Sequence, residues 1–309
     1  MKDIGIIYCP NHRPFTSPAK RWEEIAECLR VHGIDYDMVQ SEHAQSVERL
    51  VMMMINNGYK TIVIAGGDSA LNDAVNCLMK VEKHVRESIA LAVIPNGTVN
   101  DFAAYWGFYY KEIETSIIAL KHHRIRKVDA GCLRYTNREN QNCQRYFLNC
   151  VNVGLLARTQ KLRRQMRRRL WSRKVSFAAS MVLMLLRKTE HKMTYTLDSI
   201  TESHRVTTLC AGSARGYGQT PNATPYNGML DITVVRRNAW TQLLEAMLLY
   251  IRGEILNHNK LKVFRTRSIE IEAPKGIPVT VDGRPEESPV GAFRISILPE
   301  EINFIIEKG

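Results

Sequence analysis

Hydrophobic and polar residues in the first 125 positions form a pattern that predicts strands followed by helices. Short apolar runs rich in β-branched residues are typical of strands buried in a sheet, whereas apolar residues three or four apart indicate the buried face of a helix. The predicted strands are 4–8, 35–39, 61–64 and 89–94, and the predicted helices are 22–33, 47–58, 69–80, 98–106 and 111–122. This alternation predicts a parallel sheet covered by helices.

The pattern changes near residue 126, where short strands separated by turn residues replace the alternation. The predicted strands are 128–135, 145–153, 193–197, 205–211, 230–235, 261–265, 268–272, 279–281 and 293–298, with helical segments near 155–188 and 240–252. Such strands favour an antiparallel, sandwich-like or barrel-like sheet. We therefore predict an α/β domain over 1–125, a β-rich domain over 126–290 and a C-terminal segment over 291–309.

Two turns between a strand and a helix carry candidate chemistry. Gly66-Gly67-Asp68 follows the strand at 61–64, and the segment from Pro95 to Phe102 follows the strand at 89–94. Glycine permits close approach of the backbone to a ligand, and the start of a helix presents unpaired N–H groups to an anion. The two glycines of the first motif alone are better explained by a structural turn. Together, at the carboxyl ends of two strands, they indicate a ligand site.

The two motifs resemble the catalytic domain of the diacylglycerol kinase family, which includes sphingosine kinases and small bacterial lipid kinases. The family pattern Pro-x-Gly-Thr-x-Asn-Asp-Phe-Ala is matched by Pro95, Gly97, Thr98, Asn100, Asp101, Phe102 and Ala103. The pattern Gly-Gly-Asp-Gly-Thr-Leu-Asn-Glu is matched by Gly66, Gly67, Asp68, Leu71 and Asn72. Residues 221–231 and 279–285 resemble two further family segments, although their Asn-Gly and Asp-Gly pairs alone predict β-turns.

This resemblance implies an N-terminal nucleotide domain, a C-terminal β-sandwich-like lipid domain with a cleft between them, and last residues that pack back onto the first domain. It implies ATP-dependent phosphoryl transfer to a hydroxyl of a diacylglycerol-like or sphingoid lipid, with ATP and Mg²⁺ as cofactors. Asp68 and Asp231 are the implied Mg²⁺ ligands, and Asp282 is the implied general base. The implied nucleotide-binding residues are Gly66, Gly67, Asp68, Ser69, Asn72, Pro95, Gly97, Thr98 and Asp101.

Four departures from the family pattern keep a second hypothesis open. Ser69-Ala70 replaces Gly-Thr, the segment 9–14 replaces a glycine-rich loop, Asn227 replaces Asp, and Arg284 replaces Glu. These changes add a Cβ, remove a hydroxyl and remove carboxylates at phosphate-facing or metal-facing positions. The alternative is therefore a catalytically weakened relative that binds nucleotide or lipid as a regulator. NAD kinase shares Gly-Gly-Asp, but the complete second motif disfavours that assignment.

The net charge of +12 is concentrated in residues 158–174, which contain many Lys and Arg residues and no acidic residue. Leu162, Met166, Leu170 and Trp171 interleave with these charges at helical spacing. Such a segment favours an anionic membrane surface as its partner, with a solvated helix face as the alternative and nucleic acid as the weakest hypothesis. A homodimer is left open.

The apolar run 177–186 is about half of the ~20 residues that a spanning helix needs. We find no pattern of a signal peptide, and we expect a cytoplasmic protein bound peripherally at the inner membrane surface. The seven cysteines are scattered, which argues against a zinc site and against a disulfide framework.

Overall fold

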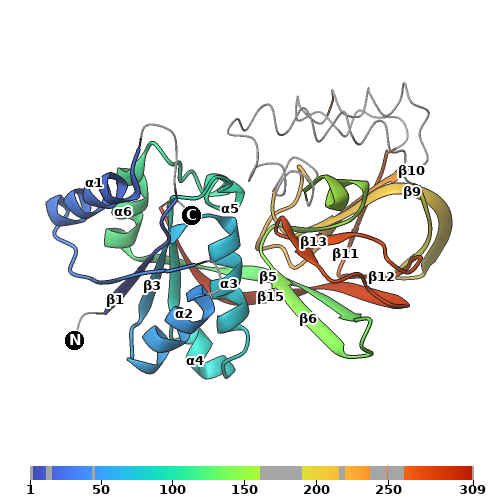
Figure 1. The fold of residues 1–309 in the computed structure, drawn as a ribbon, viewed down its shortest axis with the longest axis horizontal. Coiled ribbons are helices and arrows are strands. Elements are labelled where there is room, and N and C mark those ends of the chain that lie inside the picture. The colour runs from blue at the N-terminus through green and yellow to red at the C-terminus, as the bar shows by residue number, and fades with distance from the viewer. Residues whose placement is uncertain are drawn as a thin grey trace. The chain divides into compact units, whose positions relative to one another are not determined.

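A computed structural model of the chain describes residues 3–11, 16–43, 46–160, 190–215, 220–236, 249 and 261–307. The chain divides into two compact units (Figure 1). Unit 1 comprises Met1–Ala130 and Pro299–Gly309, and unit 2 comprises Gly131–Leu298. Both unit boundaries fall within long strands, β5 (Arg124–Thr136) and β15 (Ala292–Ile306).

Unit 1 is a parallel sheet with helices packed along it (Figure 1). Its strands are β1 (Ile4–Tyr8), β2 (Asp37–Gln40), β3 (Thr61–Gly66) and β4 (Ala90–Pro95). Its helices are α1 (Pro18–Val31), α2 (Ser46–Asn56), α3 (Asp68–Leu78), α4 (Lys83–Glu87), α5 (Asp101–Tyr105) and α6 (Ile113–His122). The predicted parallel α/β arrangement is confirmed, and α4 is a short helix that the periodicity did not reveal.

The order of parallel strands in unit 1 is β4-β3-β1-β2, and the end of β15 lies beside β4. Every residue of β3 and β4 is buried, which explains why both strands are uninterrupted apolar runs. All four strands therefore present their carboxyl ends at one edge of the sheet, where the two predicted motifs begin.

Unit 2 consists of antiparallel strands, which confirms the predicted β-rich, sandwich-like fold. Its elements are β6 (Asn142–Phe147), β7 (Cys150–Gly154), β8 (His191–Leu197), β9 (Ile200–Gly212), β10 (Leu230–Arg236), β11 (Leu261–Thr266), β12 (Ser268–Glu272), β13 (Val279–Val281), β14 (Arg284–Glu286) and the ends of β5 and β15 within this unit. Strand β9 is central, since it pairs with β7, β8 and β10. Alternate residues such as Leu209, Ile232 and Ile295 are fully buried in its core.

The single strand predicted at 145–153 is wrong, because the structure divides this segment into β6 and β7. The backbone N–H groups of Leu148 and Asn149 donate to the Asp282 carboxylate rather than to a neighbouring strand. An apolar pattern that continues through Phe147 and Leu148 conceals this interruption. The break is functionally relevant, because it brings a predicted site residue against the backbone.

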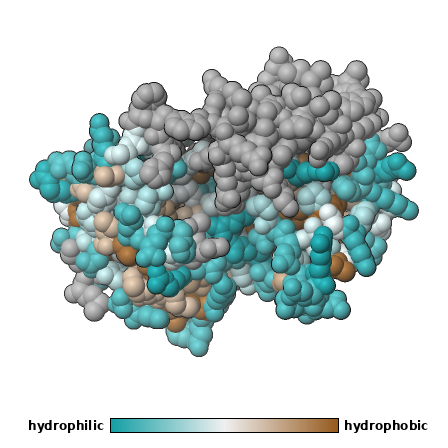
Figure 2. All heavy atoms as spheres, in the orientation of Figure 1, coloured by the Kyte–Doolittle hydropathy of each residue, from teal (hydrophilic) through white to brown (hydrophobic). Residues whose placement is uncertain are grey.

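Hydrophilic residues cover much of the face of unit 2 shown in Figure 2, whereas hydrophobic colour gathers near α2 and α3 of unit 1. Met52 and Met53 of α2 contribute exposed hydrophobic surface. Among the described helices, none has the length and apolar character needed to cross a bilayer. Most of the basic segment 158–174, and nearly all of the segment 240–252, lie outside the described residues.

Candidate nucleotide site and the carboxylates of unit 2

Three loops of unit 1 are joined by hydrogen bonds at the carboxyl edge of the parallel sheet. The Cys9 N–H donates to the carbonyl of Ala65 (2.9 Å), and the Asn96 N–H donates to the carbonyl of Gly66 (2.8 Å). The Asn96 side chain donates to the Cys9 carbonyl (2.9 Å), and the Asn11 side chain donates to the Asn96 carbonyl (2.9 Å). The loops that follow β1, β3 and β4 therefore form one connected surface.

The two predicted glycine motifs touch through their backbones. A Cβ added to Gly97 would lie 2.2 Å from the Cα of Gly67, and a Cβ added to Gly67 would lie 2.7 Å from the Cα of Gly97. Asn100 closes the second loop, because its Oδ1 accepts from the Gly97 N–H and its Nδ2 donates to the Gly97 carbonyl, both at 2.9 Å. Glycine is needed at these two positions because the loops approach so closely.

Asp68 fastens the first motif to the second. Its N–H donates to the carbonyl of Val99 (3.1 Å). Its carboxylate accepts from the N–H groups of Asp101 (2.8 Å) and Phe102 (3.3 Å), so it caps the start of α5. With 4% of its surface exposed, Asp68 is buried between the two loops.

Helix α3 begins directly behind this contact and has a polar first half. Gly67 is its N-cap and supplies no side-chain cap, while Ser69 in the first turn is only partly buried. Asn72, Asp73 and Asn76 are almost fully buried, and Asn76 donates to the backbone and side-chain oxygens of Asn72 (2.8 and 3.1 Å). The dipole of α3 favours an anion at this helix start, while the N–H of Asp68 is already bonded to the carbonyl of Val99.

The thiol of Cys9, next to this site, is unreactive. Burial, with a smaller contribution from the nearby negative charge of Asp73, raises the pKa of Cys9 to about 11. Cys9 is therefore a neutral thiol at physiological pH and a poor metal ligand or nucleophile.

An arginine on α1 fixes the strand end that precedes the second motif. Buried Arg21 donates to the carbonyls of Pro95 (3.3 Å) and Tyr110 (2.6 Å). Its guanidinium lies 3.9 Å from the centre of the Tyr110 ring. Sequence reasoning missed this residue, although an arginine at the same helical spacing as buried Ile25 and Leu29 is a usable signal.

In unit 2, Asp282 occupies a tight hairpin between β13 and β14, as its Asp-Gly pair predicts. Asp282 and Gly283 both have positive φ (46° and 74°), the geometry of a type I′ turn. The Asp282 carboxylate accepts three backbone N–H groups, from Leu148 (2.9 Å), Asn149 (3.0 Å) and Cys150 (3.0 Å). Because all three bonds would weaken if the carboxylate took up a proton, the structure shows a fastening role for Asp282, and its role as a base stays a prediction.

Asp231 lies at the same end of the sheet of unit 2 as Asp282. Asp231 pairs with Gly212 of β9, and Gly212 pairs with Cys150, whose N–H donates to Asp282. Asp231 is buried, and its Oδ1 accepts from the Nε of Arg265 at 3.1 Å. The structure thus gives this predicted metal ligand a cationic partner from the protein, and its fit to a metal ion is poor.

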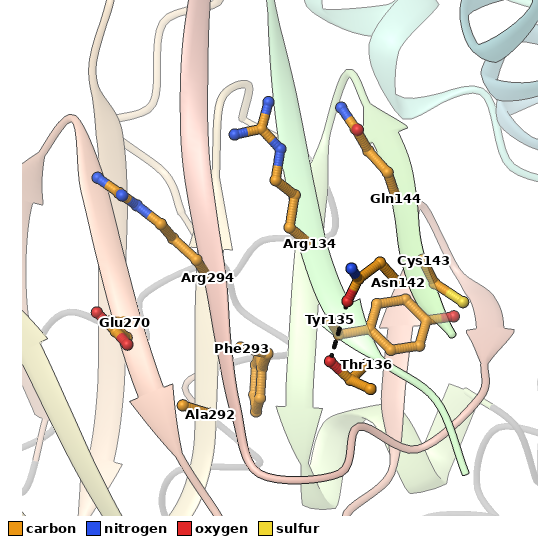
Figure 3. A pocket seen from close by; sticks show the side chains of 10 residues that line it. All are labelled: Arg134, Tyr135, Thr136, Asn142, Cys143, Gln144, Glu270, Ala292, Phe293 and Arg294. Atoms are coloured by element: carbon orange, nitrogen blue, oxygen red, sulfur yellow. Dashed lines mark hydrogen bonds between the residues drawn. The ribbon is translucent and has the colours of Figure 1, made fainter. Parts of the chain in front are cut away.

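A separate cavity of about 450 Å³ lies in unit 2 among β5, β6, β12 and β15 (Figure 3). Arg134 and Arg294 extend from two strands beside it, and Phe293 lies below both of them in this view. Glu270 also lines the cavity, so that both charge signs are present. None of the predicted site residues lines it, and this mixture of charges does not select a ligand.

Comparison with known proteins places these motifs in a family. Residues 15–133 match the diacylglycerol kinase catalytic domain, and residues 149–306 match the YegS C-terminal NAD kinase beta sandwich-like domain. The chain belongs to the diacylglycerol kinase family. This result confirms the predicted resemblance over nearly the whole chain.

Two curated relatives carry lipid kinase names. A probable YegS-like lipid kinase of Shewanella frigidimarina is 26% identical over 281 residues, covering 90% of this chain and 86% of the relative. A diacylglycerol kinase of Mycobacterium tuberculosis is 23% identical over 261 residues, covering 82% of this chain and 80% of the relative.

Solved structures show the same fold. A diacylglycerol kinase from Bacillus anthracis has a TM-score of 0.71 at 19% identity, covering 99% of this chain and 97% of that chain. Yeast NADH kinase has a TM-score of 0.56 at 10% identity, covering 99% of this chain and 84% of that chain. At these identities the likeness concerns the fold alone.

Proposed function

We propose that this family member is an ATP-dependent lipid kinase that transfers a phosphoryl group to a hydroxyl of a diacylglycerol-like or sphingoid lipid. The observation that carries the proposal is the joined pair of loops, in which Gly67 and Gly97 touch and Asp68 caps α5. The names of the curated relatives support the same reaction class.

The nucleotide phosphates would bind at the start of α3 and along the second loop. Gly66 and Gly67 keep the backbone accessible there, and the partly buried Ser69 and Thr98 provide hydroxyl groups that can donate to phosphate oxygens. Pro95, Asn72 and Asp101 would act by shaping the loops and the helix starts. Binding of this kind depends on loop geometry more than on any single charged side chain.

Mg²⁺ would neutralise the charge that develops on the transferred phosphoryl group. Asp68 would be the protein ligand of this ion, because its carboxylate lies where the two loops meet and carboxylate oxygens are ligands that Mg²⁺ prefers. Among the described residues no group of three or more His, Cys, Asp or Glu side chains gathers as a metal cage. A single carboxylate plus phosphate oxygens and water is a usual arrangement for this ion.

A transfer assay with radiolabelled ATP, mixed membrane lipids, Mg²⁺ and anionic vesicles tests the proposal directly. We expect labelled lipid. The absence of labelled lipid, with nucleotide binding retained, would eliminate the kinase proposal and favour the regulator.

Asp282→Asn separates the two roles of Asp282. If Asp282 is the base as well as a fastening residue, the variant should lose far more turnover than its fall in melting temperature explains, while its nucleotide affinity stays close to that of the wild type. If Asp282 only fastens residues 148–150, melting temperature and turnover should fall together, because an amide oxygen accepts fewer of the three N–H groups.

The regulator remains the second candidate, and one observation favours it. The carboxylates of Asp68 and Asp282 are both committed to backbone N–H groups, which is a structural use of the two residues expected to do chemistry. Ala70 adds to this, because it replaces a threonine hydroxyl in the first turn of α3.

We also propose that the protein acts at the inner surface of the cytoplasmic membrane, through the basic segment 158–174, and that nucleic acid is not its partner. Reversing Arg167, Arg168 and Arg169 to Glu should weaken co-sedimentation with anionic vesicles, and high salt should do the same. If the variant and the wild type sediment equally with the vesicles at all salt concentrations, the segment 158–174 is a solvated surface without a membrane role. We also propose that the protein forms a homodimer, and sedimentation velocity tests this proposal.

A further inference from the structure

The second residue of β10, Asp231, carries a buried negative charge. Asp231 is 3% exposed and stands opposite Gly212 of β9 on one side and Arg265 of β11 on the other. A buried carboxylate needs a positive partner or several donors, because the loss of hydration is otherwise uncompensated. The sequence resemblance implied a divalent cation for this role.

Arg265 contacts two oxygen atoms at this position. Its Nε donates to Asp231 Oδ1 at 3.1 Å, and its Nη2 donates to the Asn222 carbonyl at 3.5 Å. One carboxylate and one backbone carbonyl are the kinds of oxygen that a hard cation gathers. The guanidinium therefore joins the strand to the loop 220–227, as a bound cation would.

The neighbouring polar side chains of the loop 220–227 make other contacts than with the Asp231 carboxylate. The side chain of Asn227 turns back on its own loop, where its Oδ1 accepts from the Met229 N–H at 3.0 Å. Thr220 packs on Gly212 so closely that a Cβ there would lie 2.3 Å from its Oγ1, which holds the loop down. Among the described residues, Asp231 Oδ2 is buried without a hydrogen-bond partner.

We infer that Arg265 is the resident cation of this site, replacing the divalent ion, and that the uncompensated Asp231 carboxylate becomes a divalent-cation site once the guanidinium charge is removed. With Arg265 present, the pair is neutral overall and attracts a second cation weakly, since affinity for a divalent ion depends on the number of ligand charges. With Arg265 neutralised, Oδ1, Oδ2 and the Asn222 carbonyl form an oxygen site of net negative charge. This inference does not rest on the proposed kinase activity.

Thermal unfolding of the full chain without nucleotide tests the inference. Arg265→Gln removes the charge but keeps a donor, Arg265→Lys keeps the charge, and Arg267→Gln is the matched control because Arg267 is exposed nearby. Each protein is unfolded with a chelator, with millimolar Ca²⁺ and with millimolar Mg²⁺. We expect Arg265→Gln to melt about 5 °C lower in chelator, since one partner of a partly buried pair is lost.

We expect Ca²⁺ to restore at least half of that loss in Arg265→Gln and to leave the wild type, Arg265→Lys and Arg267→Gln unchanged. Adding Asp231→Asn to Arg265→Gln should abolish the response to Ca²⁺. A wild type that gains as much from Ca²⁺ as Arg265→Gln would overturn the inference, because the metal would then bind beside the arginine. If Arg265→Gln stays unfolded both in chelator and in Ca²⁺, the inference is also overturned.

Discussion

The contact between Gly67 and Gly97 makes Gly97→Ala the sharpest test of the nucleotide site. The new Cβ would lie 2.2 Å from the Cα of Gly67, 2.8 Å from its nitrogen and 2.9 Å from the Oδ1 of Asn100. Ordinary contacts of a Cβ begin near 3.4 Å, so that the loops must separate by more than 1 Å. Two of the three obstructing atoms belong to the backbone, so no side-chain rotation relieves the overlap.

The cost follows from this geometry. Forcing an extra methyl group into a packed region costs about 1–3 kcal/mol, and about 2 kcal/mol corresponds to a lower melting temperature by roughly 4–8 °C. A displacement of about 1 Å in a positioning loop reduces activity by roughly a hundredfold. We expect nucleotide affinity, measured by calorimetry, to fall by at least tenfold.

Gly107→Ala is the control, because it tests a glycine of the same unit for a different reason. Gly107 has a φ of +82° and no atom within 4 Å of an added Cβ, so the substitution costs roughly 1 kcal/mol of backbone strain without moving a neighbour. It should lower stability and leave nucleotide affinity unchanged. If Gly97→Ala binds nucleotide as tightly as Gly107→Ala does, the contact between the loops does not shape the site.

Two further predictions concern carboxylates in each unit. Asp68→Ala leaves the N–H groups of Asp101 and Phe102 without their acceptor, so these amides should exchange hydrogen faster and stability should fall by about 1–2 kcal/mol; unchanged exchange would contradict the capping role. Hydrogen bonds from Tyr195, Lys262 and Arg236 lower the pKa of Glu202 to about 2 from 4.5, so that its contribution is present above about pH 4.5 and is lost as the pH falls through about 2. Because solvent screens this surface cluster, the contribution is about 1 kcal/mol. Urea unfolding should show Glu202→Gln to be less stable than the wild type at neutral pH and equally stable near pH 2. A stability difference that does not change with pH would contradict this pKa.

Sequence reasoning predicted the parts of the fold that depend on burial. β3 and β4 are buried on both faces, so their composition alone marks them as central parallel strands. It failed at 148–149, where the strand is interrupted by hydrogen bonds to Asp282, more than 130 positions later in the chain. No local pattern encodes an acceptor that distant.

The candidate site divides in the same way. Gly67 and Gly97 are identified by their motifs, because the close approach that they allow is a local requirement of each turn. The role of Arg265 was not predictable, since an exposed arginine in a strand has the same sequence signature whether it is paired or solvated. Only the register of β10 and β11 places it opposite Asp231.

The motif carboxylates of the two units share one property that governs how the chemistry must be tested. Asp68 accepts two backbone N–H groups and Asp282 accepts three, so each residue determines the position of a loop as well as carrying a charge. An alanine variant at either position removes both contributions, and its inactivity would not distinguish a catalytic carboxylate from a structural one. Asparagine keeps the shape and one acceptor oxygen while removing the charge. Turnover that is lost in the asparagine variants while loop protection is retained therefore argues for chemistry, and joint loss of both argues that these carboxylates only fasten the loops.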